Sequence, residues 1–298
     1  MDAPSKHVPW TEYALLGLLA VLWGASYLFI KVAVTEIPPV TLIATRVSIA
    51  AVFLSIVLLL QGGKLPRDAQ TWRMLLLQSF FNSIGAWTIL AWGQQYVDSG
   101  LASVLNSTSP IFIFIITALV TRHEATGVLI LLGACLGLLG VILIVGVDAL
   151  AGLGQQVAGQ LAAIVGANLY AFAAIYGKRF SHLTATATAT GTMIWASVVL
   201  IPASLALEQP WALTPSVKAM TAAIILSILC TGCALLIYFR LVKTLGSMGV
   251  ASQAYLRAGV GVVLGITVLG EKITLVIGLG LAAAIIGVVA INVPVKKI

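Results

Sequence analysis

The sequence predicts an all-α integral membrane protein whose ten transmembrane helices form two inverted five-helix repeats. Three observations support this fold class: the hydropathy, a repeated sequence pattern and the distribution of cationic residues. Hydrophobic residues make up 60% of the 298 residues and charged residues only 8%, whereas about 25% of the residues of a typical soluble domain are charged. The mean hydropathy of +1.11 indicates a chain that lies largely within a bilayer.

Glycine, proline and charged residues divide the chain into ten apolar segments. Each is close to the roughly 20 residues that a helix needs to cross a hydrocarbon core about 30 Å thick. The expected spans are residues 13–35, 40–60, 73–97, 100–121, 126–147, 157–178, 187–207, 217–240, 247–269 and 273–294. Only short connections remain, so we expect no soluble domain. The N-terminus is polar and the first apolar segment is long enough to span, so we expect no cleaved signal peptide.

A repeated pattern supports two similar halves. The stretch "EATGVLILLGACLGLLGV", starting at Glu124, returns 147 residues later as "EKITLVIGLGLAAAIIGV", starting at Glu271. In this register Gly133 returns as Gly280. Self-similarity at a fixed offset indicates a tandem duplication.

Lysine and arginine are unevenly distributed between the two sides of the predicted bundle. Eleven lie on the N-terminal side: Lys6, Lys64, Arg67, Arg73, Arg122, Lys178, Arg179, Arg240, Lys243, Lys296 and Lys297. Three lie on the other side: Lys31, Lys218 and Lys272. Cationic connections mark the cytoplasmic face, so we expect both termini in the cytoplasm. The absence of a soluble domain or organelle signal favours a bacterial inner membrane.

Five spans per half is an odd number, so the second half is expected to cross the membrane in the opposite sense. The expected repeats are residues 1–148 and 149–298. Inverted repeats are common in secondary transporters, where the substrate site lies between the repeats near the midplane and access alternates between the two sides. The alternative is a duplicated helical bundle that serves as a membrane enzyme or an assembly factor.

Three stretches carry a resemblance to a known family: "LLAVLWGASYLFIK", "GLASVLNSTSPIFIFIITALVTRHE" and "GVASQAYLRAGVGVVLGITVLGE". They resemble the EamA-type exporters of the drug/metabolite transporter superfamily, over nearly the whole chain, and are most similar to its YddG-type exporters of aromatic amino acids. The resemblance implies an inner-membrane carrier with a central cavity between helices 1–5 and 6–10. It also implies export of amino acids or related metabolites.

The resemblance also suggests where the helices bend. Pro110 fits the family's helix-breaking proline in the fourth span, but its counterpart in the ninth span is Ala258. Since proline bends a helix by removing a backbone donor, the ninth span needs another means of bending. We expect Pro110, Gly259 and Gly261 to act as hinges.

The sequence lacks signals of catalysis and of cofactor binding. It contains no H-E-x-x-H, G-x-S-x-G or phosphate-loop motif, and "CTGC" at 230–233 lies within a predicted span, where small packing residues are the better interpretation. We therefore expect no enzyme activity, cofactor or metal. The cations are scattered, which argues against nucleic acid. A small-molecule substrate and the lipid bilayer are the expected partners, and the chain could be a monomer or a homodimer.

Two charged residues fall well inside predicted spans, where a cation costs about 2.5–3.5 kcal/mol on insertion scales. Arg46 lies six residues into its span, and we expect it to snorkel to the membrane surface as a structural residue. Arg257 lies ten residues into its span and shares a helix face with Gln253. It could bind a substrate carboxylate or clamp two helices.

Uncharged polar and aromatic residues outline a candidate cavity. An amino acid needs polar partners for its ammonium and carboxylate groups and an apolar wall for its side chain, and aromatic rings supply both a wall and cation–π contacts. The candidate substrate-binding residues are Trp23, Tyr27, Gln78, Asn82, Trp87, Asn106, Ser107, Asn168, Tyr170, Tyr238, Tyr255 and Arg257.

The sequence thus predicts export of amino acids, neutral or aromatic ones, by alternating access. No Asp or Glu falls at a predicted midplane position, and an antiporter that exchanges protons for cationic drugs needs such a carboxylate. Facilitated diffusion is therefore the expected mode. The alternatives are a proton-coupled exporter of drugs or metabolites and a carrier of phosphorylated metabolites or nucleotide sugars.

Overall fold

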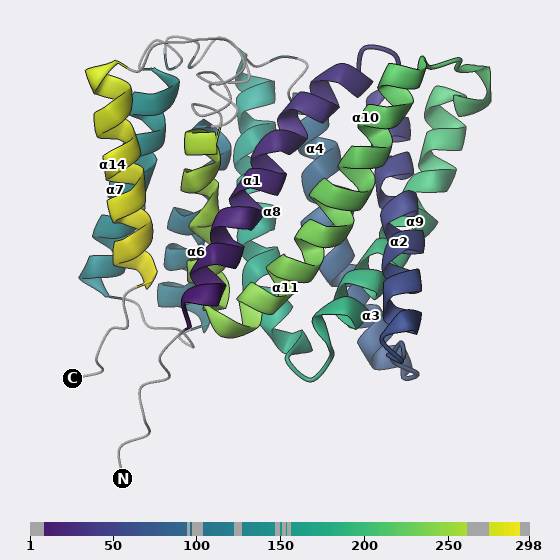
Figure 1. Ribbon diagram of the computed structural model, residues 1–298, viewed down its shortest axis with the longest axis horizontal. Helices are drawn as coiled ribbons and strands as arrows, with labels where there is room; N and C mark the ends of the chain where they lie inside the picture. The colour runs from purple at the N-terminus through teal and green to yellow at the C-terminus, as the bar shows by residue number, and fades with distance from the viewer. Residues whose placement is uncertain are drawn as a thin grey trace.

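The computed structural model shows a bundle of helices joined by short connections, with no strand among the residues that it describes (Figure 1). These are residues 9–93, 96, 104–121, 127–146, 150, 153, 156–260 and 274–292. Within these described ranges, seven helices are long and apolar enough to cross a membrane, and Val104–Leu119 is a shorter apolar helix. The prediction of an all-helical, multi-pass membrane protein is therefore confirmed.

The first half of the chain, which we take as residues 9–146, begins with two long helices and continues with shorter ones. The elements are α1 (Trp10–Ala33), α2 (Pro39–Leu60), α3 (Ala69–Ser79), η1 (Phe80–Ile84), α4 (Gly85–Gly93), α6 (Ser109–Ile116), η2 (Thr117–Thr121) and α7 (Val128–Val145). Residues 104–106 form a further helical turn before α6.

The second half, residues 150–292, follows a similar order. Its elements are α8 (Val157–Gly177), η4 (Lys178–Phe180), α9 (Ala185–Glu208), η5 (Pro210–Ala212), α10 (Val217–Ser227), η6 (Ile228–Cys233), α11 (Ala234–Thr244), α12 (Gly246–Ala251), the helical segment 253–260 and α14 (Leu275–Asn292). The predicted spans 100–121 and 247–269 extend beyond the described residues, so the count of ten spans stays a prediction.

Several helix starts follow from local side-chain chemistry. Asp68, Thr184 and Ser216 precede α3, α9 and α10, and each side chain accepts a hydrogen bond from the backbone N–H three residues later, at 2.7, 3.1 and 3.2 Å. Such caps satisfy a donor that has no partner within the first turn. Pro39 occupies the first position of α2, where its missing N–H costs nothing.

In each half, the third long helix is divided by a π-helical segment. This helix is Ala69–Gly93 (α3, η1 and α4) in the first half and Val217–Thr244 (α10, η6 and α11) in the second. The segment η1 follows α3, and η6 follows α10, starting 148 residues later in the chain. The first of these packs against α8 and α9, and the second against α1 and α2. Each π-segment therefore faces the opposite half. Segments of this kind are rare and are frequent at functional sites.

Two helix pairs hold the halves together at the edges of the bundle: α7 with α14 on one side, and α2 with α9 on the other (Figure 1). In the first pair, a Cβ atom at Gly140 would lie 2.6 Å from the carbonyl oxygen of Gly280, and one at Gly287 would lie 2.6 Å from that of Gly133. The two helices are therefore antiparallel. Their backbones touch through the same glycines that repeat in the sequence, as is usual for small residues in membranes.

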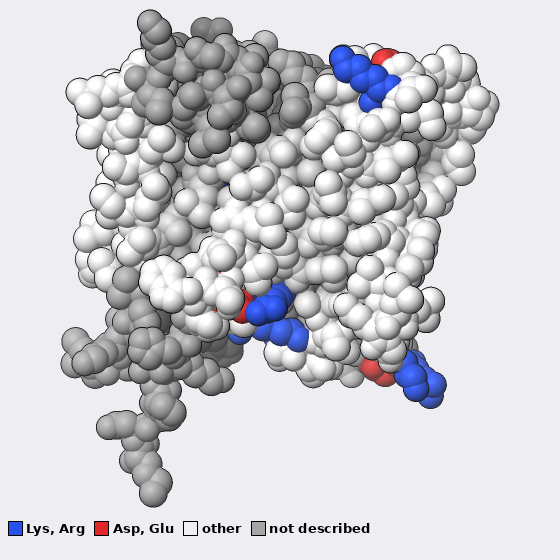
Figure 2. Space-filling model, viewed as in Figure 1, with Lys and Arg blue, Asp and Glu red and all other residues white. Residues whose placement is uncertain are grey.

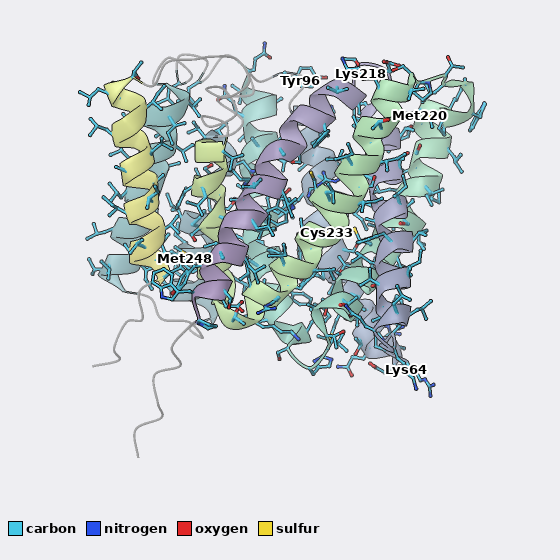
Figure 3. All side chains as sticks on the ribbon, in the orientation of Figure 1. Lys64, Tyr96, Lys218, Met220, Cys233 and Met248 are labelled. Carbon is cyan, nitrogen blue, oxygen red and sulfur yellow. The ribbon has the colours of Figure 1, made fainter. Side chains whose placement is uncertain are left out.

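The charged side chains mark the two ends of the bundle. Figure 2 shows Lys, Arg, Asp and Glu gathered at two levels, with uncharged surface between them. Lys64 and Lys218 lie at opposite ends, and Cys233, the last residue of η6, lies between them (Figure 3). Tyr13 near the start of α1 donates to the carbonyl oxygen of Asn292 at the end of α14, at 3.5 Å, so these two helix ends share one side.

Glutamates connect the halves at the opposite side. Glu36, in the connection between α1 and α2, accepts hydrogen bonds from the backbone N–H and the hydroxyl of Ser216 at 2.6 and 2.8 Å. Glu208, the last residue of α9, accepts from the backbone N–H groups of Val40 and Thr41 at 3.1 and 2.6 Å. Each carboxylate therefore lies at the start of a helix of the other half, where the helix dipole favours a negative charge.

Candidate functional site

Three predicted site residues from three helical segments meet inside the bundle, and we call them the Trp23 cluster. Trp23 lies in α1, Tyr238 in α11 and Arg257 in the segment 253–260. The ring centroids of Trp23 and Tyr238 are 5.5 Å apart, and the guanidinium carbon of Arg257 lies 5.7 Å from the centroid of the Trp23 ring. Since α1 belongs to the first half and the other two segments to the second, the cluster lies between the halves.

Arg257 has an aromatic neighbour but no acidic one. Among the described residues, no hydrogen bond or ion pair reaches its guanidinium group, which makes a cation–π contact with the Trp23 ring. A guanidinium is a planar fork of N–H donors that fits a carboxylate through two parallel hydrogen bonds. The geometry therefore suits an anionic group on a bound molecule.

A glycine lets the Arg257 segment approach α1. A Cβ atom at Gly24 would lie 3.0 Å from Cγ1 of Val260 and 3.6 Å from the carbonyl oxygen of Arg257. Small residues at such a contact allow two helices to pack closely in a membrane. Gly24 thus positions the neighbouring Trp23 ring against the arginine.

Arg46 is not snorkelled to the membrane surface, so that expectation is wrong. Only 7% of the residue is exposed. Its guanidinium carbon lies 3.9 Å from the centroid of the Trp87 ring in α4, and its Nε atom donates to the hydroxyl of Thr231 in η6 at 2.6 Å. The stacked ring and the hydroxyl replace the water that snorkelling would supply. Trp87, another predicted site residue, is thereby paired with a cation in the interior.

The two predicted amides of the third long helix are buried at the contact between the halves. Gln78 is 0% exposed and Asn82 is 1% exposed. The Nε2 atom of Gln78 donates to the carbonyl oxygen of Ala173 in α8 at 3.1 Å, and the Nδ2 atom of Asn82 donates to the hydroxyl of Ser83 at 3.2 Å. Gln78 therefore joins the first half to the second, whereas the bond of Asn82 is local.

Asn106, Ser107 and Pro110 lie at a break between helical segments. The helical turn 104–106 ends at Ser107, and α6 begins at Ser109, so Pro110 is the second residue of α6. Proline is tolerated there because the first N–H groups of a helix have no partner within it. Asn106 and Ser107 are 5% and 4% exposed. The hinge role of Pro110 stays a prediction, but the proline directly follows an interruption of the helix.

The predicted residues of α8 differ in their surroundings. Asn168 is partly buried, and its Nδ2 atom donates to the carbonyl oxygen of Ile164 in its own helix at 3.2 Å. Tyr170 packs, partly buried, against the core that contains Tyr238. Tyr170 therefore packs against the same core as Tyr238, while the hydrogen bond of Asn168 remains local.

Tyr255 anchors its segment to α7. It is fully buried, its hydroxyl donates to the carbonyl oxygen of Ala134 at 2.9 Å, and a Cβ atom at Gly137 would lie 2.3 Å from its ring. Among the described residues, a Cβ atom at Gly259 would meet Leu281, at 3.1 Å. Substrate contact by Tyr255 and a hinge at Gly259 stay predictions.

Two further predicted residues lie partly or wholly outside the described residues. These are the side chain of Tyr27 and the whole of Gly261.

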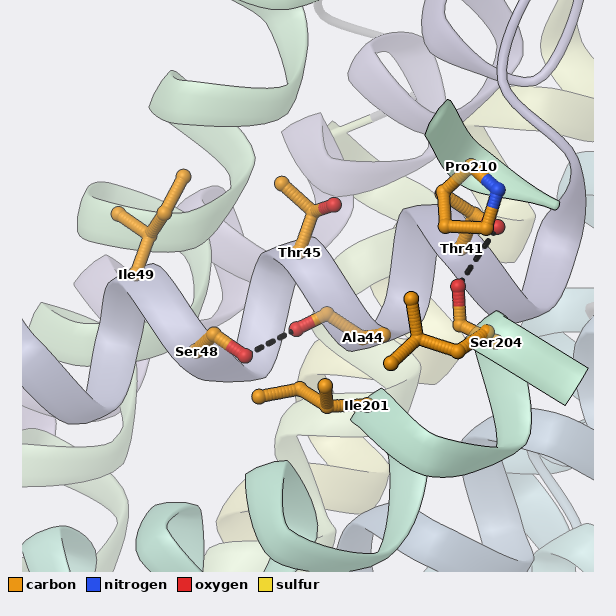
Figure 4. A pocket seen from close by; sticks show the side chains of 9 residues that line it. Thr41, Ala44, Thr45, Ser48, Ile49, Ile201, Ser204 and Pro210 are labelled. Carbon is orange, nitrogen blue, oxygen red and sulfur yellow. Dashed lines mark hydrogen bonds between the residues drawn. The ribbon is translucent and has the colours of Figure 1, made fainter. Parts of the chain in front are cut away.

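A pocket of about 300 Å³ lies elsewhere, between α2 and α9 (Figure 4). Its lining residues are Thr41, Ala44, Thr45, Ser48, Ile49, Ile201, Ser204, Leu205 and Pro210. The hydroxyls of Thr41 and Ser204 are 2.9 Å apart, and Ser48 donates to the carbonyl oxygen of Ala44 at 2.7 Å. None of the predicted site residues lines this pocket.

Sequence reasoning missed residues whose partners come from distant parts of the chain. Thr231 accepts the hydrogen bond of the buried Arg46. Glu12 forms an ion pair with Arg240 in α11, at 2.6 Å. The one available signal was that a cation inside a span needs a partner. No group of three or more His, Cys, Asp or Glu that could hold a metal occurs in the described part of the chain.

Comparison with known proteins identifies relatives along most of the chain. A model of the EamA-like transporter family matches residues 11–146 and again residues 157–293. The chain is 28% identical over 228 residues to the uncharacterized transporter YoaV of Bacillus subtilis, covering 76% of this chain and 78% of that protein. It is 26% identical over 280 residues to the uncharacterized inner membrane transporter YedA of Escherichia coli K12, covering 94% of this chain and 90% of that protein.

A solved crystal structure of another protein has a similar fold. The TM-score is 0.81, and the superposition covers 95% of this chain and 97% of the other at 16% sequence identity. At this identity the likeness concerns the fold alone.

Proposed function

The chain belongs to the EamA-like transporter family, and we propose that this membrane transporter exports amino acids, neutral or aromatic ones, by alternating access. The observation that carries the proposal is the Trp23 cluster. It combines two aromatic rings with an arginine that has no acidic neighbour among the described residues, and it lies between the two halves. A carboxylate fits the arginine and an apolar or aromatic side chain fits the rings.

We further propose that the halves are inverted repeats, over residues 1–148 and 149–298. Three observations support this. The family model matches each half, a π-segment divides the third long helix of each half, and α7 packs antiparallel to its counterpart α14. Two similar halves of opposite orientation can exchange conformations, which opens the site alternately to each side.

The described acidic residues support facilitated diffusion rather than proton coupling. Glu12, Glu36, Asp68 and Glu208 all lie in first or last helical turns or in connections, and none lies at mid-span. A proton-coupled antiporter of cations needs a carboxylate that alternates between proton and substrate.

The cationic residues Lys64, Arg240 and Lys243 lie at the side where α1 begins. By the excess of positive charge on cytoplasmic loops, we place that side in the cytoplasm and the protein in a bacterial inner membrane.

A second candidate function is transport of a more strongly anionic metabolite, such as a phosphorylated one. The buried position of Arg46 favours it, since the interior then holds a second guanidinium besides Arg257. Several converging cations are what a phosphate needs.

The test is flux of radiolabelled amino acids into proteoliposomes for the wild type and for Trp23→Leu and Arg257→Gln. We expect each substitution to lower flux at least about tenfold, a loss of about 1.4 kcal/mol of interaction, while the purified protein stays monodisperse. Normal flux in both variants would exclude this cluster as the site, and competition by sugar phosphates rather than amino acids would favour the second candidate.

A further inference from the structure

The carbonyl oxygen of the Gln78 side chain is a buried acceptor whose orientation is known. Its Nε2 atom donates to the backbone carbonyl oxygen of Ala173. Since a carbonyl can only accept a hydrogen bond, the nitrogen of the amide must face Ala173 and the oxygen must be the other atom. That Oε1 atom is sealed from solvent and has no hydrogen-bond partner among the described residues.

The hydroxyl of Ser79, the next residue in the chain, is in the same situation. It is 0% exposed and has no hydrogen-bond partner among the residues that the structure describes. Serines in helices usually donate to the carbonyl oxygen four residues back, as Ser48, Ser55 and Ser197 do in this protein. Ser79 does not, and it directly precedes the π-segment η1. Two buried polar atoms on consecutive residues therefore lack partners among the described residues, which is costly for a protein unless water or a ligand meets them.

The position of these atoms connects them with transport. Gln78 and Ser79 belong to the first half, and the Ala173 carbonyl that orients the amide belongs to α8 of the second. Gly177 lies one helical turn further along α8, and a Cβ atom there would lie 3.7 Å from the Gln78 Nε2 atom. The contact is closed in this conformation. In the proposed alternating access, a movement of α3 away from α8 would free the Gln78 amide from Ala173 and open this contact to the path between the halves.

We propose that Oε1 of Gln78 and the hydroxyl of Ser79 form the subsite for the α-ammonium group of the transported amino acid. An ammonium group carries three N–H donors and no acceptor, so it can donate to an amide oxygen and to a hydroxyl at the same time. This inference rests on the proposed function. It adds that the carrier distinguishes an amino acid from the corresponding keto acid, which has the same carboxylate and side chain but no ammonium group.

The experiment measures inhibition of labelled phenylalanine flux in proteoliposomes by unlabelled phenylalanine and by phenylpyruvate. For the wild type we expect phenylalanine to inhibit at least about tenfold more strongly, since a site built around a hydrogen bond rejects the analogue that lacks it. Gln78→Met keeps the size of the side chain and removes the acceptor, so the ratio of the two inhibition constants should fall towards one. Gln78→Glu loses the donor to the Ala173 carbonyl, but in the folded variant phenylpyruvate should bind still more weakly relative to phenylalanine than in the wild type, because a carboxylate attracts ammonium and repels the keto acid.

Gln160→Met is the matched control, since Gln160 is also a buried glutamine and lies in α8 near its start. It should leave the ratio unchanged. If Gln78→Met does not fold, Ser79→Ala decides the question, because removal of one hydroxyl should lower the same ratio.

The outcomes separate this inference from the function on which it rests. Wild-type flux with an unchanged ratio in Gln78→Met and Ser79→Ala would overturn the ammonium subsite and assign these atoms to bound water, while leaving amino acid transport intact. Absence of any amino acid flux in the wild type would instead contradict the proposed function.

Discussion

Glu12 and Arg240 join the first helix of one half to the third long helix of the other. One carboxylate oxygen of Glu12 accepts from Nε and Nη2 of Arg240 at 3.1 and 2.6 Å, and the other accepts from the hydroxyl of Thr244 at 2.8 Å. The Glu12 side chain is 3% exposed and that of Arg240 is 54% exposed. The pair closes the contact between α1 and α11 at the side where α1 begins.

Glu12→Gln should weaken this contact. The amide loses the charge-assisted bond to the guanidinium, and since Arg240 remains solvated, the loss of stability should be about 1 kcal/mol. We expect a melting temperature in detergent that is lower by a few degrees. Arg240→Lys keeps the charge but loses the pair of N–H donors that both reach Glu12, so it should give a similar decrease. An unchanged melting temperature in both variants would show that the pair contributes nothing to stability.

Acidification should loosen the opposite side through Glu36. The backbone N–H of Ser216 and then its hydroxyl hold the pKa of the Glu36 carboxyl below its usual value of 4.5. A carboxyl whose pKa is lower in the folded state stabilises the protein above the unfolded pKa, and this contribution is lost as the pH falls through the folded pKa. Stability should therefore decline as the pH falls below about 4.5.

The measurement is the midpoint of thermal unfolding between pH 6 and pH 3. Asp68, whose pKa is lowered by the backbone N–H of Thr71, contributes in the same direction. Glu36→Gln should therefore show a smaller pH dependence than the wild type rather than none. The same pH dependence in the variant would contradict a role for the Glu36 contact.

Gly140→Ala should destabilise the pair of helices α7 and α14. The new Cβ atom would lie 2.5 Å from the backbone nitrogen of Ala284, and backbone cannot move aside as a side chain can. Overpacking of this kind costs about 1–3 kcal/mol. Gly278→Ala in α14 is the control, because a Cβ atom there meets none of the described residues within 4 Å. Equal melting temperatures for the two variants would show that the glycine contact is not tight.

Arg46→Lys should destabilise the folded protein although it retains the positive charge. A lysine ammonium cannot lie flat on the Trp87 ring, and it has no counterpart of the Nε atom that donates to Thr231. We expect a loss of about 1–3 kcal/mol, measured as a lower melting temperature. Thr231→Val should reproduce part of that loss. A lysine variant as stable as the wild type would indicate that the arginine serves only as a charge.

The sequence was sufficient for features that depend on periodic pattern and composition. The apolar segments predicted most of the described helices within a few residues, and the repeated glycines around Gly133 and Gly280 mark positions where α7 and α14 touch. These follow from hydropathy and from the close packing that small residues allow.

Other features depend on contacts that no local pattern encodes. The π-segments η1 and η6 lie within sequences that read as continuous helices. Trp87 and Thr231, which hold Arg46 in the interior, come from two other elements, and its position in the chain alone suggested the membrane surface. The Trp23 cluster was predicted residue by residue, but which of the polar and aromatic candidates meet depends on how the halves pack.

The most direct test of the account is uptake of a panel of labelled amino acids into proteoliposomes of the purified protein, with and without an imposed pH gradient. We expect saturable uptake of neutral or aromatic amino acids at a rate that the gradient does not change. Uptake that requires the gradient would contradict facilitated diffusion, and no uptake of any amino acid would contradict the central claim.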